Sequence, residues 1–245
     1  MSVPDSETEC LIGLGGNVGP VEQTIQNALE QLAERACEIL HVSRFYRSAP
    51  MGPNAGQEFV NAAARIRTVL SPHELLSLQQ QIENESGRTR GMHWGPRTLD
   101  LDLLCYGQLQ VSSDDLTVPH PGIWYRRFVL EPLCEIAPDW QHASLNMSMC
   151  ELRHRLALWP LRIEVVATEL PQLSEHHKDL ISLELLSPEN ADRPVAAGVF
   201  CRLVTDTGCH LKSTDESGFV LTVGPKERES LLASVADAAL GKCEP

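Results

Sequence analysis

Short apolar runs in the first 107 residues predict strands. Four of them stand out, at 9–16, 38–46, 58–70 and 98–107. They are rich in β-branched, aromatic or alternating apolar residues and are bounded by residues typical of turns. The first run ends in a group of glycines, which predicts a strand that leads into a tight turn.

Two segments between these runs follow a helical period. In residues 20–36, Pro20 suits the first helical turn, and the apolar side chains recur at positions that share one helix face. Residues 71–87 begin with the sequence SPHE, a capping-box pattern, and end at a glycine. Both segments therefore predict amphipathic helices.

The order of these elements is strand, helix, strand and again strand, helix, strand. It predicts an α+β fold of the ferredoxin-like βαββαβ type, a sandwich with an antiparallel sheet. An open parallel α/β sheet is the rival interpretation. It is less favoured because only a loop, RSAPMGPNAGQ at 47–57, separates the second and third predicted strands.

The composition changes near residue 165. All tryptophans and tyrosines precede this point, and only Phe200 and Phe219 represent the aromatic residues after it. We therefore expect a main domain at 1–165 and a small appended α/β segment at 166–245, whose function the sequence does not indicate.

The net charge of −13 argues against binding to nucleic acid or to an anionic membrane. Apolar runs stay well short of the roughly 20 residues that span a bilayer, and the polar, acidic start MSVPDSETEC is unlike a signal peptide. The eight cysteines are scattered without a CxxC pair, which predicts reduced thiols. These features predict a cytoplasmic protein.

Two aspartates interrupt the apolar stretch WGPRTLDLDLL at 94–104. In a strand, the leucines would point into a core while Asp100 and Asp102 share the opposite face. Their like charges would repel, and we expect nothing in the stretch to offset them unless a cation lies between the two. A pair of this kind suits Mg²⁺, which binds a few carboxylates together with waters and phosphates. The alternative is an ordinary solvated strand face.

Basic residues gather around this acidic pair in an otherwise acidic chain. Arginine side chains bind phosphate oxygens in a bidentate manner, and a glycine-flanked loop suits a lid over a nucleotide. The alternative is a set of arginines that only keep a loop soluble. The basic candidates are Arg88, Arg90, Arg97, His120 and Arg126.

A few aromatic residues and one amide lie near predicted loop boundaries: Phe59, Asn61, Trp94 and Phe128. Two aromatic faces form a slot for a planar ligand, and an amide can read the edge of its ring. Phe59 and Phe128 could equally be core residues.

Taken together, these motifs resemble the 6-hydroxymethyl-7,8-dihydropterin pyrophosphokinase family. The signature is HWGPRTLDLDLL at 93–104. Its companions, in the family's order, are LIGLGGN, SRFYRSAPMGP, EFVNAA, GRTR, LTVPH and RRFVLEPLCEIAP, and together they cover roughly residues 10 to 160. Three departures are Gly16 in place of serine, Ala49 in place of proline, and a loop at 88–94 one residue shorter than in some members.

The resemblance implies transfer of pyrophosphate from ATP to the hydroxymethyl group of the dihydropterin, with release of AMP. It implies two Mg²⁺ ions held by Asp100 and Asp102, and loop arginines Arg88 and Arg90 that act on the phosphates. Nucleotide contacts would come from Glu83, Arg97, His120 and Arg126. The pterin would lie between Phe59 and Phe128, read by Asn61 with the backbone of Ser48 and Met51, and closed in by Trp94.

Two other functions stay open at this point. One is a different Mg²⁺-dependent nucleotide enzyme, which would need the aspartates but not the aromatic slot. The other is a non-catalytic binding module, which would be expected to have lost an aspartate or an arginine of the site.

Overall fold

A computed structural model of the chain describes residues 7–49, 57–87, 97–158, 160–167, 181–187, 200–205, 220–223 and 228–245. The chain forms two compact units. Unit 1 comprises Met1–Arg153 together with Gly241–Pro245, and unit 2 comprises His154–Leu240. The described helices do not include one that is both long and apolar enough to cross a membrane.

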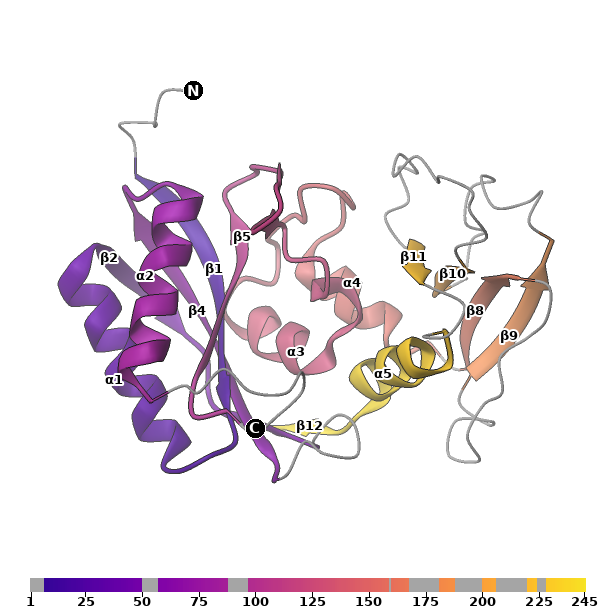
Figure 1. Cartoon of the computed structure of the whole chain (residues 1–245), viewed down its shortest axis with the longest axis horizontal. Helices are drawn as coiled ribbons and strands as arrows, with labels where there is room; N and C mark the ends of the chain where they lie inside the picture. The colour runs from indigo at the N-terminus through magenta and orange to yellow at the C-terminus, as the bar shows by residue number, and fades with distance from the viewer. Residues whose placement is uncertain are drawn as a thin grey trace. The chain divides into compact units, whose positions relative to one another are not determined.

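The centre of unit 1 is an antiparallel sheet, as predicted (Figure 1). Its strands follow the order β12-β3-β4-β1-β5, and β2 also pairs with β4. The predicted strand at 38–46 is divided into two pieces, because the regular pairing with β4 stops after Val42 and resumes at Tyr46. The strands are β1 (Thr8–Gly16), β2 (Cys37–Val42), β3 (Tyr46–Ser48), β4 (Phe59–Thr68), β5 (Asp100–Tyr106) and β12 (Cys243–Glu244).

Helices cover both faces of this sheet. Helices α1 (Val21–Arg35) and α2 (Pro72–Glu85) lie on one face, and α3 (Arg127–Ile136) lies on the other (Figure 1). The capping box of α2 is confirmed, because Ser71 Oγ accepts from the Glu74 amide and the Glu74 carboxylate accepts from the Ser71 amide. Shorter elements complete the unit: β6 (Val111–Ser112), β7 (Thr117–Val118), the 3₁₀ helix η1 (Ile123–Tyr125) and α4 (Met149–Arg155).

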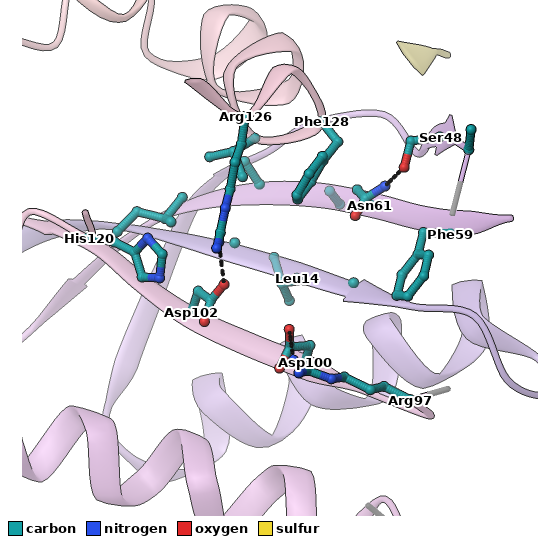
Figure 2. A pocket seen from close by; sticks show the side chains of 17 residues that line it. Leu14, Ser48, Phe59, Asn61, Arg97, Asp100, Asp102, His120, Arg126 and Phe128 are labelled. Carbon is teal, nitrogen blue, oxygen red and sulfur yellow. Dashed lines mark hydrogen bonds and ion pairs between the residues drawn. The ribbon is translucent and has the colours of Figure 1, made fainter. Parts of the chain in front are cut away.

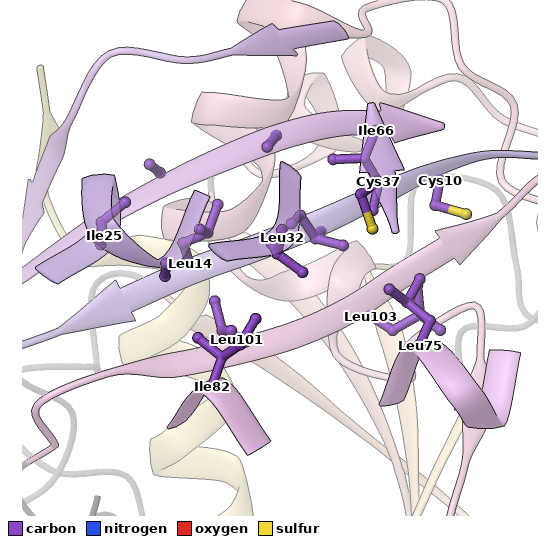
Figure 3. Close-up of a cluster of buried hydrophobic side chains, with 14 of the residues drawn as sticks. Cys10, Leu14, Ile25, Leu32, Cys37, Ile66, Leu75, Ile82, Leu101 and Leu103 are labelled. Carbon is purple, nitrogen blue, oxygen red and sulfur yellow. The ribbon is translucent and has the colours of Figure 1, made fainter. Parts of the chain in front are cut away.

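The main core of unit 1 lies between the sheet and helices α1 and α2 (Figure 3). Side chains from both helices, such as Ile25 and Ile82, pack against Leu14 of β1 and Leu101 of β5. Burial of each such side chain contributes about 1.5–3 kcal/mol relative to exposure. The cysteines of the described segments are all free thiols, as expected, and Cys10 lies in this core.

Unit 2 has a parallel sheet of its own. Its strands follow the order β11-β10-β8-β9, and the unit ends with helix α5. The bounds are β8 (Leu161–Val166), β9 (Ile181–Leu186), β10 (Cys201–Thr205), β11 (Val220–Val223) and α5 (Arg228–Leu240).

The division between the units differs from the boundary expected at 165/166. That boundary falls inside β8, a strand whose six residues carry no aromatic side chain to mark the change. The last five residues also return to unit 1, where β12 joins the antiparallel sheet. In this division, unit 2 precedes the final strand of unit 1 in the sequence.

Candidate active site

The alternation predicted for β5 is confirmed. Leu101 and Leu103 are 5% and 3% exposed and belong to the core under α2. Asp100 and Asp102 face the other way, with side chains 26% and 37% exposed. Because residues two apart in a strand share a face, the two carboxylates project together from the side of the sheet that α3 covers.

These carboxylates border a cavity of about 260 Å³ on that side of the sheet (Figure 2). Its floor includes Gly13 and Gly15 of β1, where the absence of side chains leaves room above the strand. Nine residues predicted for the site line this one cavity: Ser48, Phe59, Asn61, Arg97, Asp100, Asp102, His120, Arg126 and Phe128.

Each aspartate faces an arginine. Arg97 Nη1 donates to Asp100 Oδ2 across 2.6 Å, and Arg126 Nη1 lies 4.0 Å from Asp102 Oδ2 (Figure 2). The expectation that nothing in the stretch 94–104 offsets the acidic pair is therefore wrong. Arg97 belongs to that stretch, and the turn before β5 brings its guanidinium back onto Asp100. The cavity thus combines anionic and cationic groups within contact distance.

The position of Arg126 depends on a glycine. Its guanidinium passes so close to Gly122 that a Cβ there would lie 2.5 Å from Nε and 2.6 Å from Cζ. The same guanidinium carbon lies 6.0 Å from the centre of the Phe128 ring, within the range of a cation–π contact. A side chain at position 122 would therefore displace Arg126 from the cavity wall.

The surroundings of His120 favour a neutral imidazole. Burial lowers its pKa to about 4, and the nearby charge of Arg126 acts in the same direction. Its Nδ1 accepts a hydrogen bond from the Gly122 amide at 3.0 Å, so the ring proton is on Nε2. A neutral ring of this kind can donate one hydrogen bond to an anionic ligand.

The other end of the cavity is aromatic and amide-lined. Asn61 on β4 and Ser48 on β3 are each 7% exposed, and Asn61 Nδ2 donates to Ser48 Oγ at 2.9 Å. Phe59 comes from β4 and Phe128 from the first turn of α3, and Figure 2 shows Asn61 between them. A planar ligand held between the two rings would present its edge to the amide.

Asn17 supports this site, although no role was predicted for it. Its Oδ1 accepts from the Arg97 amide at 2.8 Å, its own amide donates to the Arg97 carbonyl, and its Nδ2 donates to the Gln57 carbonyl at 3.2 Å. It therefore fixes the turn that presents Arg97. The only signal in the sequence is an asparagine directly after a pair of glycines.

The glycine before Asn17 is constrained by close packing. A Cβ at Gly16 would lie 2.6 Å from the Thr98 carbonyl oxygen, which is backbone and cannot easily yield. The departure from serine at this position therefore matches the local geometry of the chain.

Five predicted residues lie elsewhere or outside the described segments. Glu83 sits on α2, on the other side of the sheet, and is 5% exposed. Its Oε1 accepts from the Leu101 amide of β5 at 2.8 Å, and it does not line the cavity. The remaining four, Met51, Arg88, Arg90 and Trp94, are outside the residues that the structure describes.

Comparison with known families decides how this cavity is interpreted. Residues 11–138, slightly more than half of the chain, match the sequence profile of the 7,8-dihydro-6-hydroxymethylpterin-pyrophosphokinase (HPPK) family. The chain belongs to this family. The matched range contains each of the nine residues that line the cavity and were predicted from sequence.

Individual relatives agree with this assignment. A 2-amino-4-hydroxy-6-hydroxymethyldihydropteridine pyrophosphokinase from Synechocystis is 42% identical over 168 residues, which are 66% of this chain and 86% of that protein. Proteins of the same name are 46% identical in Haemophilus influenzae, over 52% of this chain and 81% of theirs, and 45% identical in Bacillus subtilis, over 51% and 75%.

Solved structures add a likeness of fold. A triple mutant of Plasmodium falciparum HPPK-DHPS gives a TM-score of 0.50 at 14% identity, and the match covers 63% of this chain. It spans 42% of that longer chain, less than two thirds of its length. The likeness therefore concerns the fold of the matched part alone.

Proposed function

We propose that this protein transfers the pyrophosphoryl group of ATP to the hydroxymethyl group of 6-hydroxymethyl-7,8-dihydropterin and releases AMP, a step of folate biosynthesis. The observation that carries the proposal is the composition of one cavity in a chain of the HPPK family. A pair of carboxylates flanked by arginines occupies one end, and two aromatic rings with a buried amide occupy the other.

The two ends of the cavity suit the two substrates. The phosphates of ATP would lie at the charged end, where Arg97, Arg126 and the Nε2–H of His120 supply donors for phosphate oxygens. The pterin would lie between Phe59 and Phe128, with Asn61 at its polar edge. This arrangement would place the hydroxymethyl group toward the phosphates, and alignment of this kind contributes much of the catalysis of phosphoryl transfer.

The donor set at the charged end fits magnesium. Asp100 and Asp102 offer hard oxygen ligands on one strand face, and the described residues contain no cluster of three or more His, Cys, Asp or Glu that could enclose a metal. Mg²⁺ commonly takes one or two carboxylates and completes its shell with waters and substrate phosphates. When bound, two Mg²⁺ ions would offset the charge of the phosphates and fix their position.

The chain's own residues would then act by charge and position. The hydroxyl oxygen of the pterin attacks the β-phosphorus, the bond from this phosphorus to the bridging α,β-oxygen breaks, and AMP leaves with that oxygen. The hydroxyl proton passes to solvent. Arg97 and Arg126 exchange their aspartate partners for phosphate oxygens and offset the charge that accumulates on them. We assign the same task to Arg88 and Arg90, and a closing role to Trp94, from the family resemblance.

Several finer assignments belong to the same proposal. Unit 1 is assigned to the ferredoxin-like class, and the order β3-β4-β1-β5 with helices after β1 and β4 supports this. Glu83 would act on the nucleotide indirectly, through its hydrogen bond to the Leu101 amide that lies between the two aspartates. Met51 would act on the pterin edge. A cytoplasmic location is also proposed, although two plant relatives are named as mitochondrial.

The test is a nucleotide assay on the full chain with ATP, Mg²⁺ and the dihydropterin. We expect AMP only when the pterin is present, and loss of most turnover, about 100-fold or more, in Asp100→Asn and Asp102→Asn. A matched control is Asp114→Asn, which lies outside the cavity and should retain activity. Folded wild-type protein that forms no AMP, or Asp102→Asn with wild-type turnover, would refute the proposal.

A further inference from the structure

The end of the chain forms the outermost strand of the sheet in unit 1. β12 pairs antiparallel with β3, with Cys243 opposite Ser48 and Glu244 opposite Arg47 (Figure 1). In the sequence, β12 follows the whole of unit 2. An element from the far end of the sequence therefore borders a strand that contributes to the cavity.

The pairing places Cys243 in register with residues of the pterin end. β3 pairs on its other side with β4, where Ser48 lies opposite Phe59 and Tyr46 lies opposite Asn61. Residues that face each other across neighbouring strands point to the same side of a sheet. Cys243, Ser48 and Phe59 thus form one row across three strands, on the side that carries the cavity.

β3 pairs with β4 on one side, and β12 closes its other edge. It is only three residues long, and without β12 its outer edge would be open, with unpaired backbone groups. Ser48 at its end accepts the hydrogen bond from Asn61, so the orientation of the amide depends on where the backbone of Ser48 lies. β12 also contacts α3, the helix that carries Phe128.

The side chain of Cys243 is half-buried on the α3 side of β12. Burial raises the pKa of this thiol to about 12, so it is a neutral thiol at physiological pH. The Cys243 side chain therefore serves only as a small packing group. The backbone pairing of β12 with β3 is the feature that can hold Ser48 in place.

We propose that β12 is a positioning element of the pterin subsite, which holds Ser48, and through it Asn61, in place by completing the sheet beside β3. The inference rests on the proposed function, since it is the pterin edge that Asn61 would read. It assigns to the last five residues a role in substrate binding that the match at 11–138 does not contain.

The test compares the full chain with a chain that ends at Leu240 and so lacks β12. We expect the KM for the dihydropterin to rise about five- to tenfold, while kcat and the KM for ATP stay within about twofold. Two controls should behave as wild type: a chain that lacks only Pro245, which follows β12, and Cys243→Ala, which keeps the backbone pairing.

A second readout reports on the pairing itself. Amide hydrogen exchange should become faster at whichever of Arg47 and Ser48 donates to β12, in the chain that ends at Leu240, and stay unchanged in both controls. An unchanged pterin KM, an unchanged exchange rate, or a parallel rise in the ATP KM would overturn the role of β12. Failure of the proposed function is distinguishable, because the intact chain would then form no pterin-dependent AMP before any residue is removed.

Discussion

Arg97 and Asp100 are joined by a 2.6 Å hydrogen bond between residues three apart at the start of β5. In the proposed function this pair must separate, because the carboxylate is needed for magnesium and the guanidinium for phosphate. Arg97 therefore offsets the negative charge of Asp100 before nucleotide binds. Its own positive charge becomes available to a phosphate once the pair separates.

Replacement of Arg97 should accordingly have opposite effects on the two ligands. Arg97→Ala removes a competitor for Asp100, so we expect binding of Mn²⁺, used as a probe for Mg²⁺, to tighten about two- to fivefold in the absence of nucleotide. The KM for ATP should rise about tenfold, since a phosphate contact is lost. Mn²⁺ titration followed by electron paramagnetic resonance and steady-state kinetics measure the two effects. Weaker Mn²⁺ binding in the variant would contradict this account.

Gly122 should control ATP binding through Arg126 alone. The backbone at Gly122 has φ −93° and ψ −1°, the conformation of the third residue of a type I turn, which most residues can adopt, so Gly122→Ala should leave the free energy of unfolding nearly unchanged. Its Cβ would nevertheless displace the guanidinium, and we expect the KM for ATP to rise about five- to tenfold. In an Arg126→Ala background the same substitution should have no further effect. An equal effect in both backgrounds would show that Gly122 acts by another route.

Phe128 should matter for the pterin and not for the nucleotide. Phe128→Ala removes one wall of the aromatic slot, so we expect the pterin KM to rise about tenfold or more, with the ATP KM nearly unchanged. Phe45→Ala is a matched control, because Phe45 packs against the core and does not line the cavity. It should lower the free energy of unfolding without changing the pterin KM. If both variants shift the pterin KM alike, the slot assignment is wrong.

His142 should make unit 1 less stable at mildly acidic pH. Burial lowers its pKa from an ordinary value of 6.5 to about 4, and its Nδ1 accepts from the Ser144 and Leu145 amides. The unfolded chain binds the proton more readily, so this contribution is present above pH 6.5 and is lost as the pH falls toward 4.

Urea unfolding at pH 7 and pH 5 measures this contribution. His142→Asn keeps an acceptor in the place of Nδ1 but cannot be protonated. We therefore expect the wild-type protein to lose about 1–2 kcal/mol more than the variant between the two pH values. An identical loss in both proteins would exclude His142 as the source.

Local patterns predicted much of unit 1. The alternation in β5 predicted the leucines in the core and the aspartates on the opposite face, because successive side chains of a strand point to opposite sides of the sheet. The SPHE sequence gave the start of α2, since a capping box is satisfied by contacts within four residues. Both features depend on short-range geometry, which a sequence states directly.

Long-range pairing was the part that could not be predicted. β12 has two residues and no periodic signal, and its position follows from an open edge at β3 rather than from its own composition. The bond from Asn17 to Arg97 joins residues 80 positions apart. The partner of Asp100 was missed for a different reason, because the strand pattern specifies a face but not the path of a neighbouring arginine.

The identity of the products tests the central claim most directly. The full chain would be incubated with ATP, Mg²⁺ and the dihydropterin. Ion-exchange chromatography would then separate the nucleotides, and mass spectrometry would measure the mass of the pterin product. Attack at the β-phosphorus predicts AMP and a pterin diphosphate in equal amounts. ADP with a pterin monophosphate, or ATP hydrolysis that leaves the pterin unmodified, would contradict pyrophosphoryl transfer.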